Sequence, residues 1–348
     1  ADISWIGTTM VFCMLSVSIF TGPLTDKLVF RLISLAGSFI CSVALMLASF
    51  TSTVWQFVPT QGVMYGIGAG FIYSPSISLT SQWHKKNRSL AIGITVAGTG
   101  VGGMIVSEIA QRLMEAVGYN WTLRVLALMA FCMSGTAASF YKRRVPIPRE
   151  GYPADSYWHS WTVCPRRDIY DLVLSPNSSI DAWSVRKASN KLAIYLSAGS
   201  TVGRIVSSYA SIAFGSINSI FISYTLCSVL ILVAMLAIKS MAAYIALAII
   251  YGAISVSYVS VAPLMIAEMF GVQKVPTAMG IMNAWNSIGV LIGNPSQGAI
   301  YQHLDRPNSS FAGITIWGAT SLFLAACSFV VLKAIVICGG PHRIWSKL

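Results

Sequence analysis

The stretch Asn87–Leu113, NRSLAIGITVAGTGVGGMIVSEIAQRL, decides between two kinds of protein. Its centre, GTGVGG at Gly98–Gly103, satisfies G-x-G-x-x-G, the fingerprint of dinucleotide-binding folds. That fingerprint cradles a pyrophosphate only where a strand precedes it and an acidic residue follows about 20 positions on. Here the glycines lie inside an apolar run of about 23 residues with neither feature, so the stretch predicts a membrane-spanning helix.

The glycines of this helix are then expected to pack against a neighbour. Gly98 and Gly102 form a G-x-x-x-G step, and Gly93 with Ala97 repeats the same spacing of small residues. Small residues four positions apart let two helix backbones approach closely in a membrane. We expect such packing at six glycines of two apolar stretches: Gly93, Gly98, Gly102, Gly103, Gly289 and Gly293.

The whole chain shares this apolar character. Its 348 residues are 55% hydrophobic and only 10% charged, with a mean hydropathy of +0.69, whereas soluble domains carry about 25% charged residues. Apolar windows of about 20 residues, long enough to cross a bilayer core of roughly 30 Å, recur along it. We count ten, at residues 3–22, 32–51, 55–80, 89–111, 121–141, 192–214, 217–238, 241–266, 276–300 and 311–335. The predicted fold class is an all-α polytopic membrane protein.

The net charge of +12 follows from membrane topology and does not indicate a nucleic-acid partner. Most of the 23 Lys and Arg lie in alternate connections between the windows and in the segment 142–191. This is the positive-inside pattern, which places these connections in the cytoplasm.

The segment 142–191 is polar, charged and Pro-rich, so it predicts a cytoplasmic linker with little fixed structure. It separates an N-terminal half-bundle, 1–141, from a C-terminal half-bundle, 192–335, and residues 336–348 form a cytoplasmic tail. The first residues lack the basic region and cleavage site of a signal peptide. Because a span begins almost at residue 1, we expect that something upstream is absent from this chain.

The two halves repeat each other in sequence. An offset of 187 places Gly93 on Gly280 and aligns four further pairs of like residues: Ala91 with Ala278, Ala97 with Ala284, Gly102 with Gly289 and Ile105 with Ile292. Repeated membrane spans joined by a basic loop are typical of transporters, whose two halves face each other across a site near the bilayer midplane. We therefore expect a two-half bundle; the alternative is chance matching between Gly- and Ala-rich helices.

The sequence offers few arrangements of residues suited to catalysis or metal binding. The seven Cys form no C-x-x-C pair, and the four His all lie outside the apolar windows. No Ser-His-Asp set and no pair of carboxylates within a span is found either. We expect no metal, no cofactor and no enzymatic activity.

Arg204 stands out because it lies about a dozen residues into its apolar window, and a cation at membrane depth indicates function by default. The alternative is an arginine that reaches an interface or belongs to a structural pair. Asn283 and Asn286, one turn apart on another window, need partners on a neighbouring helix or a wet cavity. Tyr65 and Tyr258 are further candidates for a cavity.

The stretch GPLTDKLVFR, Gly22 to Arg31, is expected to form a tight cytoplasmic turn. It resembles the signature between the second and third helices of the major facilitator superfamily, matching at Gly22, Asp26, Lys27 and Arg31. Asp26 is suited to accept hydrogen bonds from a helix N-terminus, and Arg31 to pair with a carboxylate of a neighbouring helix. Such contacts would latch one state of a transporter. The alternative is a solvated turn that follows the charge rule, and Arg88 in the next basic connection belongs to the same expected gate.

A wider resemblance points to one group within this superfamily. GRIVSSYASIAFGSIN, Gly203 to Asn218, is similar to a motif of fungal relatives of the monocarboxylate porter family, although Ile212 stands at its acidic position. The resemblance extends over most of residues 1–141 and 187–335. It implies proton symport of a small organic anion by alternating access, in a plasma or vacuolar membrane.

The resemblance also implies residue roles. In that family the arginine at the position of Arg204 binds the substrate carboxylate, and animal members carry an Asp at the position of Ser200, which adds Ser200 to the candidate site. No acidic residue lies in the middle of any window, and Glu108 is expected to pair with Arg112 one turn on.

The ten windows correspond to family helices two to six and eight to twelve, so the first and seventh helices are apparently lacking. We therefore hypothesise an incomplete or degenerate porter. The alternative function is accordingly a non-transporting membrane protein, either a sensor or a remnant derived from a porter.

Overall fold

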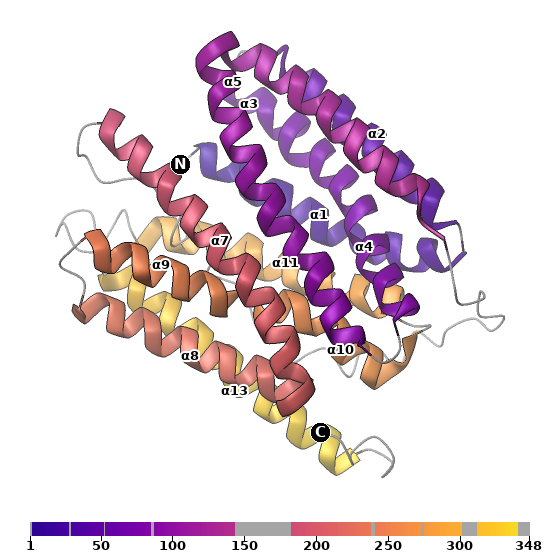
Figure 1. Ribbon diagram of the computed structural model, residues 1–348, viewed down its shortest axis with the longest axis vertical. Helices are drawn as coiled ribbons and strands as arrows, with labels where there is room; N and C mark the ends of the chain where they lie inside the picture. The colour runs from indigo at the N-terminus through magenta and orange to yellow at the C-terminus, as the bar shows by residue number, and fades with distance from the viewer. Residues whose placement is uncertain are drawn as a thin grey trace. The chain divides into compact units, whose positions relative to one another are not determined.

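The computed structural model describes residues 2–27, 29–51, 53–84, 87–142, 182–237, 241–272, 275–300 and 312–339. Within these ranges all regular structure is helical and no strand occurs (Figure 1). The helical segments are α1 (Asp2–Lys27), α2 (Phe30–Ala48), α3 (Val54–Phe57), the π-helical η1 (Val58–Met64), α4 (Tyr65–Trp83), α5 (Arg88–Ser139), α7 (Ala182–Phe214), α8 (Ser216–Ala237), α9 (Met241–Ser255), α10 (Ser257–Phe270), α11 (Val275–Ile300) and α13 (Ala312–Gly339).

These helices confirm the predicted fold class. The third window is built from α3, η1 and α4, the eighth from α9 and α10, and the fourth and fifth windows both lie almost entirely in α5. Helix is the expected outcome, because a single segment in hydrocarbon must satisfy its backbone hydrogen bonds internally. Among the described residues, five segments are long and apolar enough to cross a membrane: Trp5–Thr25, Phe30–Ala48, Arg88–Ser139, Ser216–Val233 and Ile245–Phe270.

Glycines with positive φ mark two of the turns between spans. Gly118 has φ 80° inside α5 and separates the fourth window from the fifth. Gly215, with φ 83°, separates α7 from α8, and its N–H donates to the Ser211 carbonyl at 3.0 Å. Glycine occupies this left-handed region without the steric cost that a Cβ brings, so each turn needs one residue only.

The predicted linker 142–191 differs from the structure at its C-terminal end. Residues 143–181 lie outside the described residues, but α7 already begins at Ala182, so 182–191 are helical. Ala, Lys and Arg in this stretch are good helix formers. The 33 residues of α7 are about 50 Å long at 1.5 Å per residue, longer than a bilayer core. The predicted tail, 336–348, begins within α13 and continues beyond the described residues.

The described residues form two compact units that alternate along the chain. Unit 1 comprises those within Ala1–Arg88, Val106–Thr162 and Ile266–Ile292, and unit 2 comprises the remainder. In unit 1, α4 packs against both α1 and α2. A buried cluster of Leu45, Ala48, Leu123 and Ala127 joins α2 to the second part of α5. The predicted half-bundle boundaries at residues 141 and 192 stay a prediction.

In unit 2, α7 packs against α9, and α8 packs against α13. The α7–α9 contact is close, because a Cβ added to Gly203 would overlap the backbone of Ala253. The rings of Tyr224, Tyr258 and Phe329 form an aromatic cluster between α8, α10 and α13. This unit therefore has a core of its own.

Large apolar side chains are exposed on both units. Phe39 and Leu128 are more than half exposed in unit 1, as are Val206 and Leu324 in unit 2. In water such a surface would aggregate, whereas it suits the lipid tails that surround a membrane-spanning helix.

Candidate functional site

Arg204 lies on α7 in unit 2 and is held by two oxygens of α5. Its Nη1 donates to the Val96 carbonyl at 3.0 Å and to Thr99 Oγ1 at 2.5 Å. The side chain is half-buried. Both acceptors are neutral, so these two bonds orient the guanidinium without cancelling its positive charge.

The close approach of α5 to α7 depends on small residues. A Cβ added to Gly93 would lie 2.9 Å from the Arg204 carbonyl oxygen, and one added to Gly100 would lie 3.1 Å from Arg204 Nη1. Ser89 Oγ adds hydrogen bonds to the Ser208 carbonyl and to Ser211 Oγ at 2.6 Å. Gly93 thus lies where the backbones of α5 and α7 are close.

Gly98, Gly102 and Gly103, the glycines of GTGVGG that the sequence predicts to pack, differ from Gly93. A Cβ added to Gly98, Gly102 or Gly103 would meet no atom of the described chain within 4 Å. The face that packs carries Gly93, Ala97 and Gly100, which are all buried. Several spacings of small residues overlap in this stretch, and the rotation of α5 that brings Val96 and Thr99 to Arg204 turns Gly98 away.

A second close helix pair, α1 with α11, lies in unit 1. A Cβ added to Gly22 would lie 2.6 Å from the Pro276 carbonyl oxygen, and one added to Gly280 would overlap the Ser18 carbonyl oxygen. Further along the pair, Ser16 Oγ donates to Ser287 Oγ at 2.9 Å. Gly22 of the predicted gating motif therefore has a packing role.

Asn283 and Asn286 lie on α11 in this pair and are 2% and 3% exposed. Asn283 Nδ2 has no hydrogen-bond partner among the described residues. A buried amide without a partner costs free energy unless something else binds it, so Asn283 is a candidate for ligand contact. Gly289 and Gly293 of α11 are also buried.

The remaining candidates lie in locally satisfied or well-packed surroundings. Ser200 Oγ, one turn before Arg204, donates to the Ser197 carbonyl at 2.9 Å. Tyr65 packs against the buried α2–α5 cluster of unit 1. Tyr258 belongs to the aromatic cluster of unit 2 and is buried.

In the gating motif, Arg31 binds a different partner from the one the sequence suggests. Its Nε donates to the Ser139 carbonyl at 2.8 Å, at the C-terminus of α5. The last carbonyls of a helix lack partners within the helix and attract cations, so a carboxylate is not needed there. The side chains of Asp26 and Lys27 lie outside the described residues.

Arg88, the other predicted gating residue, begins α5. Its Nε donates to the His84 carbonyl at 3.2 Å, and the Glu268 carboxylate interacts with it electrostatically. Glu268 is at the end of α10, so Arg88 links two helix ends of unit 1.

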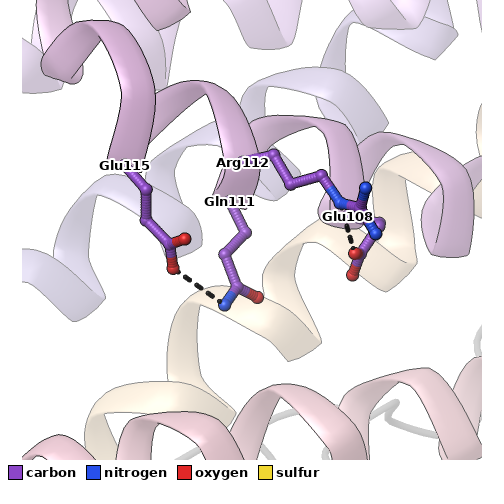
Figure 2. Close-up of polar contacts among 4 residues, drawn as sticks. All are labelled: Glu108, Gln111, Arg112 and Glu115. Carbon is purple, nitrogen blue, oxygen red and sulfur yellow. Dashed lines mark hydrogen bonds and ion pairs between the residues drawn. The ribbon is translucent and has the colours of Figure 1, made fainter.

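The predicted pairing of Glu108 with Arg112 is confirmed. Figure 2 shows the two side chains one turn apart on α5, with Arg112 Nε 2.8 Å from Glu108 Oε1. Gln111 Nε2 donates to Glu115 Oε1 at 3.3 Å beside them. Arg112 and Glu108 are 78% and 46% exposed, so Glu108 is not a buried carboxylate that could carry a proton across the membrane.

Comparison with known proteins shows the family. The model of the Major Facilitator Superfamily matches residues 1–192 and 173–334. The chain belongs to the Major Facilitator Superfamily. It is therefore a multi-pass integral membrane protein. The family and the fold are those of membrane transporters and do not point to an enzyme.

Two fungal members of the superfamily are similar in sequence. An "MFS-type transporter" of Gibberella moniliformis is 29% identical over 361 aligned residues, which cover 100% of this chain and 85% of that protein. The "Agnestins efflux protein AgnL12" of Paecilomyces divaricatus is 28% identical, covering 93% of this chain and 78% of that protein. The structure resembles the E. coli fucose:proton symporter, FucP, with a TM-score of 0.69 and 12% identity over 95% of this chain and 90% of that one.

Sequence reasoning missed the residues that position Arg204. Val96 acts through its carbonyl, which no sequence pattern marks, and Thr99 is hidden among the glycines of GTGVGG. The internal repeat offers one signal, because an offset of 187 places Val96 on Asn283 and Thr99 on Asn286. Among the described residues no group of three or more His, Cys, Asp or Glu side chains is placed to bind a metal ion.

Proposed function

We propose that this superfamily member is a secondary transporter that moves a small organic anion of monocarboxylate type by alternating access. The observation that carries the proposal is Arg204: an arginine in an apolar span whose guanidinium is oriented by two neutral oxygens. A guanidinium presents a planar pair of donors that matches a carboxylate. Neither of these oxygens carries a charge, so these two bonds do not offset the attraction of the guanidinium for an anion.

Polar groups of α11 contribute a second element of recognition. Asn283 presents a buried amide whose Nδ2 has no protein partner among the described residues, and Asn286 follows one turn later. The sequence makes both candidates for hydrogen bonding to a substrate, since amides both donate and accept, and they lie in unit 1 whereas Arg204 lies in unit 2. Ser200, one turn before Arg204, brings a neutral hydroxyl to the same helix.

Coupling to protons belongs to the same proposal, in a plasma or vacuolar membrane. A competing function is a non-transporting protein derived from a porter, which Ile212 favours because the resembling motif carries an acidic residue there. The predicted absence of the seventh family helix would support that alternative. That prediction concerns a segment that lies mostly outside the described residues.

Uptake into proteoliposomes tests the proposal. The purified chain should accumulate labelled acetate, lactate or pyruvate, faster when the outside is more acidic, if protons drive the movement. Arg204→Ala should reduce uptake to background and Arg204→Lys should restore only part of it, because a lysine keeps the charge and loses the planar pair of donors.

Arg112→Ala is the matched control. It removes an arginine whose exposed ion pair contributes little, so uptake should equal that of the unmodified chain. Equal background uptake by the unmodified chain and by Arg204→Ala would favour the non-transporting alternative.

A further inference from the structure

The α5–α7 contact contains three hydrogen bonds that connect Arg204, Thr99 and Val96. Thr99 Oγ1 donates to the Val96 carbonyl at 2.8 Å, and Arg204 Nη1 donates to both of these oxygens. The Thr99 proton is therefore committed to Val96, which leaves a hydroxyl lone pair facing the guanidinium. One turn of α5 thus supplies two acceptors in a fixed arrangement.

We propose that Thr99 is a positioning residue for anion recognition, which it assists by fixing the orientation of the Arg204 guanidinium. The inference rests on the proposed function. With Nη1 engaged by α5, the plane of the guanidinium is set before a carboxylate arrives, so less side-chain entropy is lost on binding. Thr99 itself does not contact the anion.

Gly100, the residue after Thr99, leaves room for this arrangement. A Cβ at Gly100 would lie 3.1 Å from Arg204 Nη1 and would overlap Thr201 Oγ1. A larger residue there would push the guanidinium away from its two acceptors. The neighbouring Gly98 has no such constraint, because an added Cβ would meet no described atom within 4 Å.

The second helix pair shares the backbone contact but not the cation. Offsets of 186 and 187 relate Arg204 to Ser18 and Thr99 to Asn286. Gly93 lies against the Arg204 carbonyl, as its counterpart Gly280 lies against the Ser18 carbonyl, so the two pairs correspond in geometry. Ser18 is uncharged, and its Oγ donates to the Met14 carbonyl of its own helix at 3.1 Å. The backbone contact therefore forms without a bond like the one between Arg204 and Thr99.

Substitution of Thr99 tests the inference. Thr99→Val keeps the shape and removes the hydroxyl, and it should raise the KM for labelled lactate about tenfold, the loss expected for one hydrogen bond to a charged group. The maximal rate should stay within about twofold of the unmodified chain, because Arg204 is retained. Thr99→Ser restores the acceptor and should restore the KM.

Thr136→Val is the matched control, since the Thr136 hydroxyl donates to two carbonyls of its own helix, those of Cys132 and Met133. Its KM should not change. A KM for Thr99→Val equal to that of the control would overturn the inference.

A second readout does not depend on transport. Phenylglyoxal modifies accessible arginines, and mass spectrometry can follow the peptide that contains Arg204 in the full chain. Labelling of Arg204 should be several-fold faster in Thr99→Val and unchanged in Thr99→Ser and Thr136→Val. Equal rates in all variants would refute the positioning role. Faster labelling without lactate uptake in the unmodified chain would refute the proposed function and leave the positioning role supported.

Discussion

The α5–α7 and α1–α11 helix pairs share a close backbone contact and differ in the side chains beside it. Each brings a glycine of one helix, Gly93 or Gly280, against a backbone carbonyl of the other. At the position of that carbonyl, one pair has Arg204 and the other has Ser18. The backbone contact therefore does not require a particular side chain there, which leaves the side chain available for function. The cation is specific to one pair.

The largest expected effect comes from giving the second pair a cation. Ser18 is fully buried, and Ser18→Arg would place a charge at membrane depth without the threonine that accompanies Arg204. We expect a loss of about 3 kcal/mol in insertion or stability, seen as a large fall in folded protein by fluorescence-detected size-exclusion chromatography. Ser18→Met separates charge from size. An equal fall in both variants would show that crowding, and not charge, distinguishes the two pairs.

A smaller effect is expected from the shared backbone contact. Gly280→Ala places a methyl group on the Ser18 carbonyl, which cannot move as a side chain can. We expect destabilisation of about 1–3 kcal/mol, a drop of several degrees in Tm in detergent. Gly98→Ala adds the same methyl group where no described atom lies within 4 Å, and it should leave the Tm unchanged or slightly raised. Equal Tm values for the two variants would contradict the close contact.

The smallest effect concerns the hydrogen bond between Ser16 and Ser287, at 2.9 Å in the α1–α11 pair. A double-mutant cycle with Ser16→Ala and Ser287→Ala should give a coupling of about 0.6 kcal/mol, the average for hydrogen bonds between membrane helices. Ser328→Ala removes a hydroxyl that bonds within its own helix and supplies the baseline. Additive losses in the cycle would mean that the two hydroxyls do not hold the pair together.

The membrane-spanning helices could be predicted because the length and hydropathy of each window depend on that window's residues alone. The ion pair of Glu108 and Arg112 was predictable for the same reason, since both residues lie on one helix. Contacts between helices could not be predicted in this way. In GTGVGG the small residues allow several packing faces, and only the position of α7 selects the one with Gly100. Arg204 could be identified as a cation out of place, but its acceptor on Val96 is a backbone carbonyl without a sequence signature.

The hydroxyl contacts near the start of α5 have a mechanical consequence. Ser89 bonds Ser211 Oγ and the Ser208 carbonyl of α7, and Ser207 lies one turn before Ser211 on the same helix. If α7 slid by one turn, about 5.4 Å, Ser89 would exchange one serine for the next and keep a hydrogen bond. Because serines recur one turn apart on α7, the hydrogen bond lost in such a step would be replaced by an equivalent one, so the positions before and after the step would differ little in hydrogen bonding.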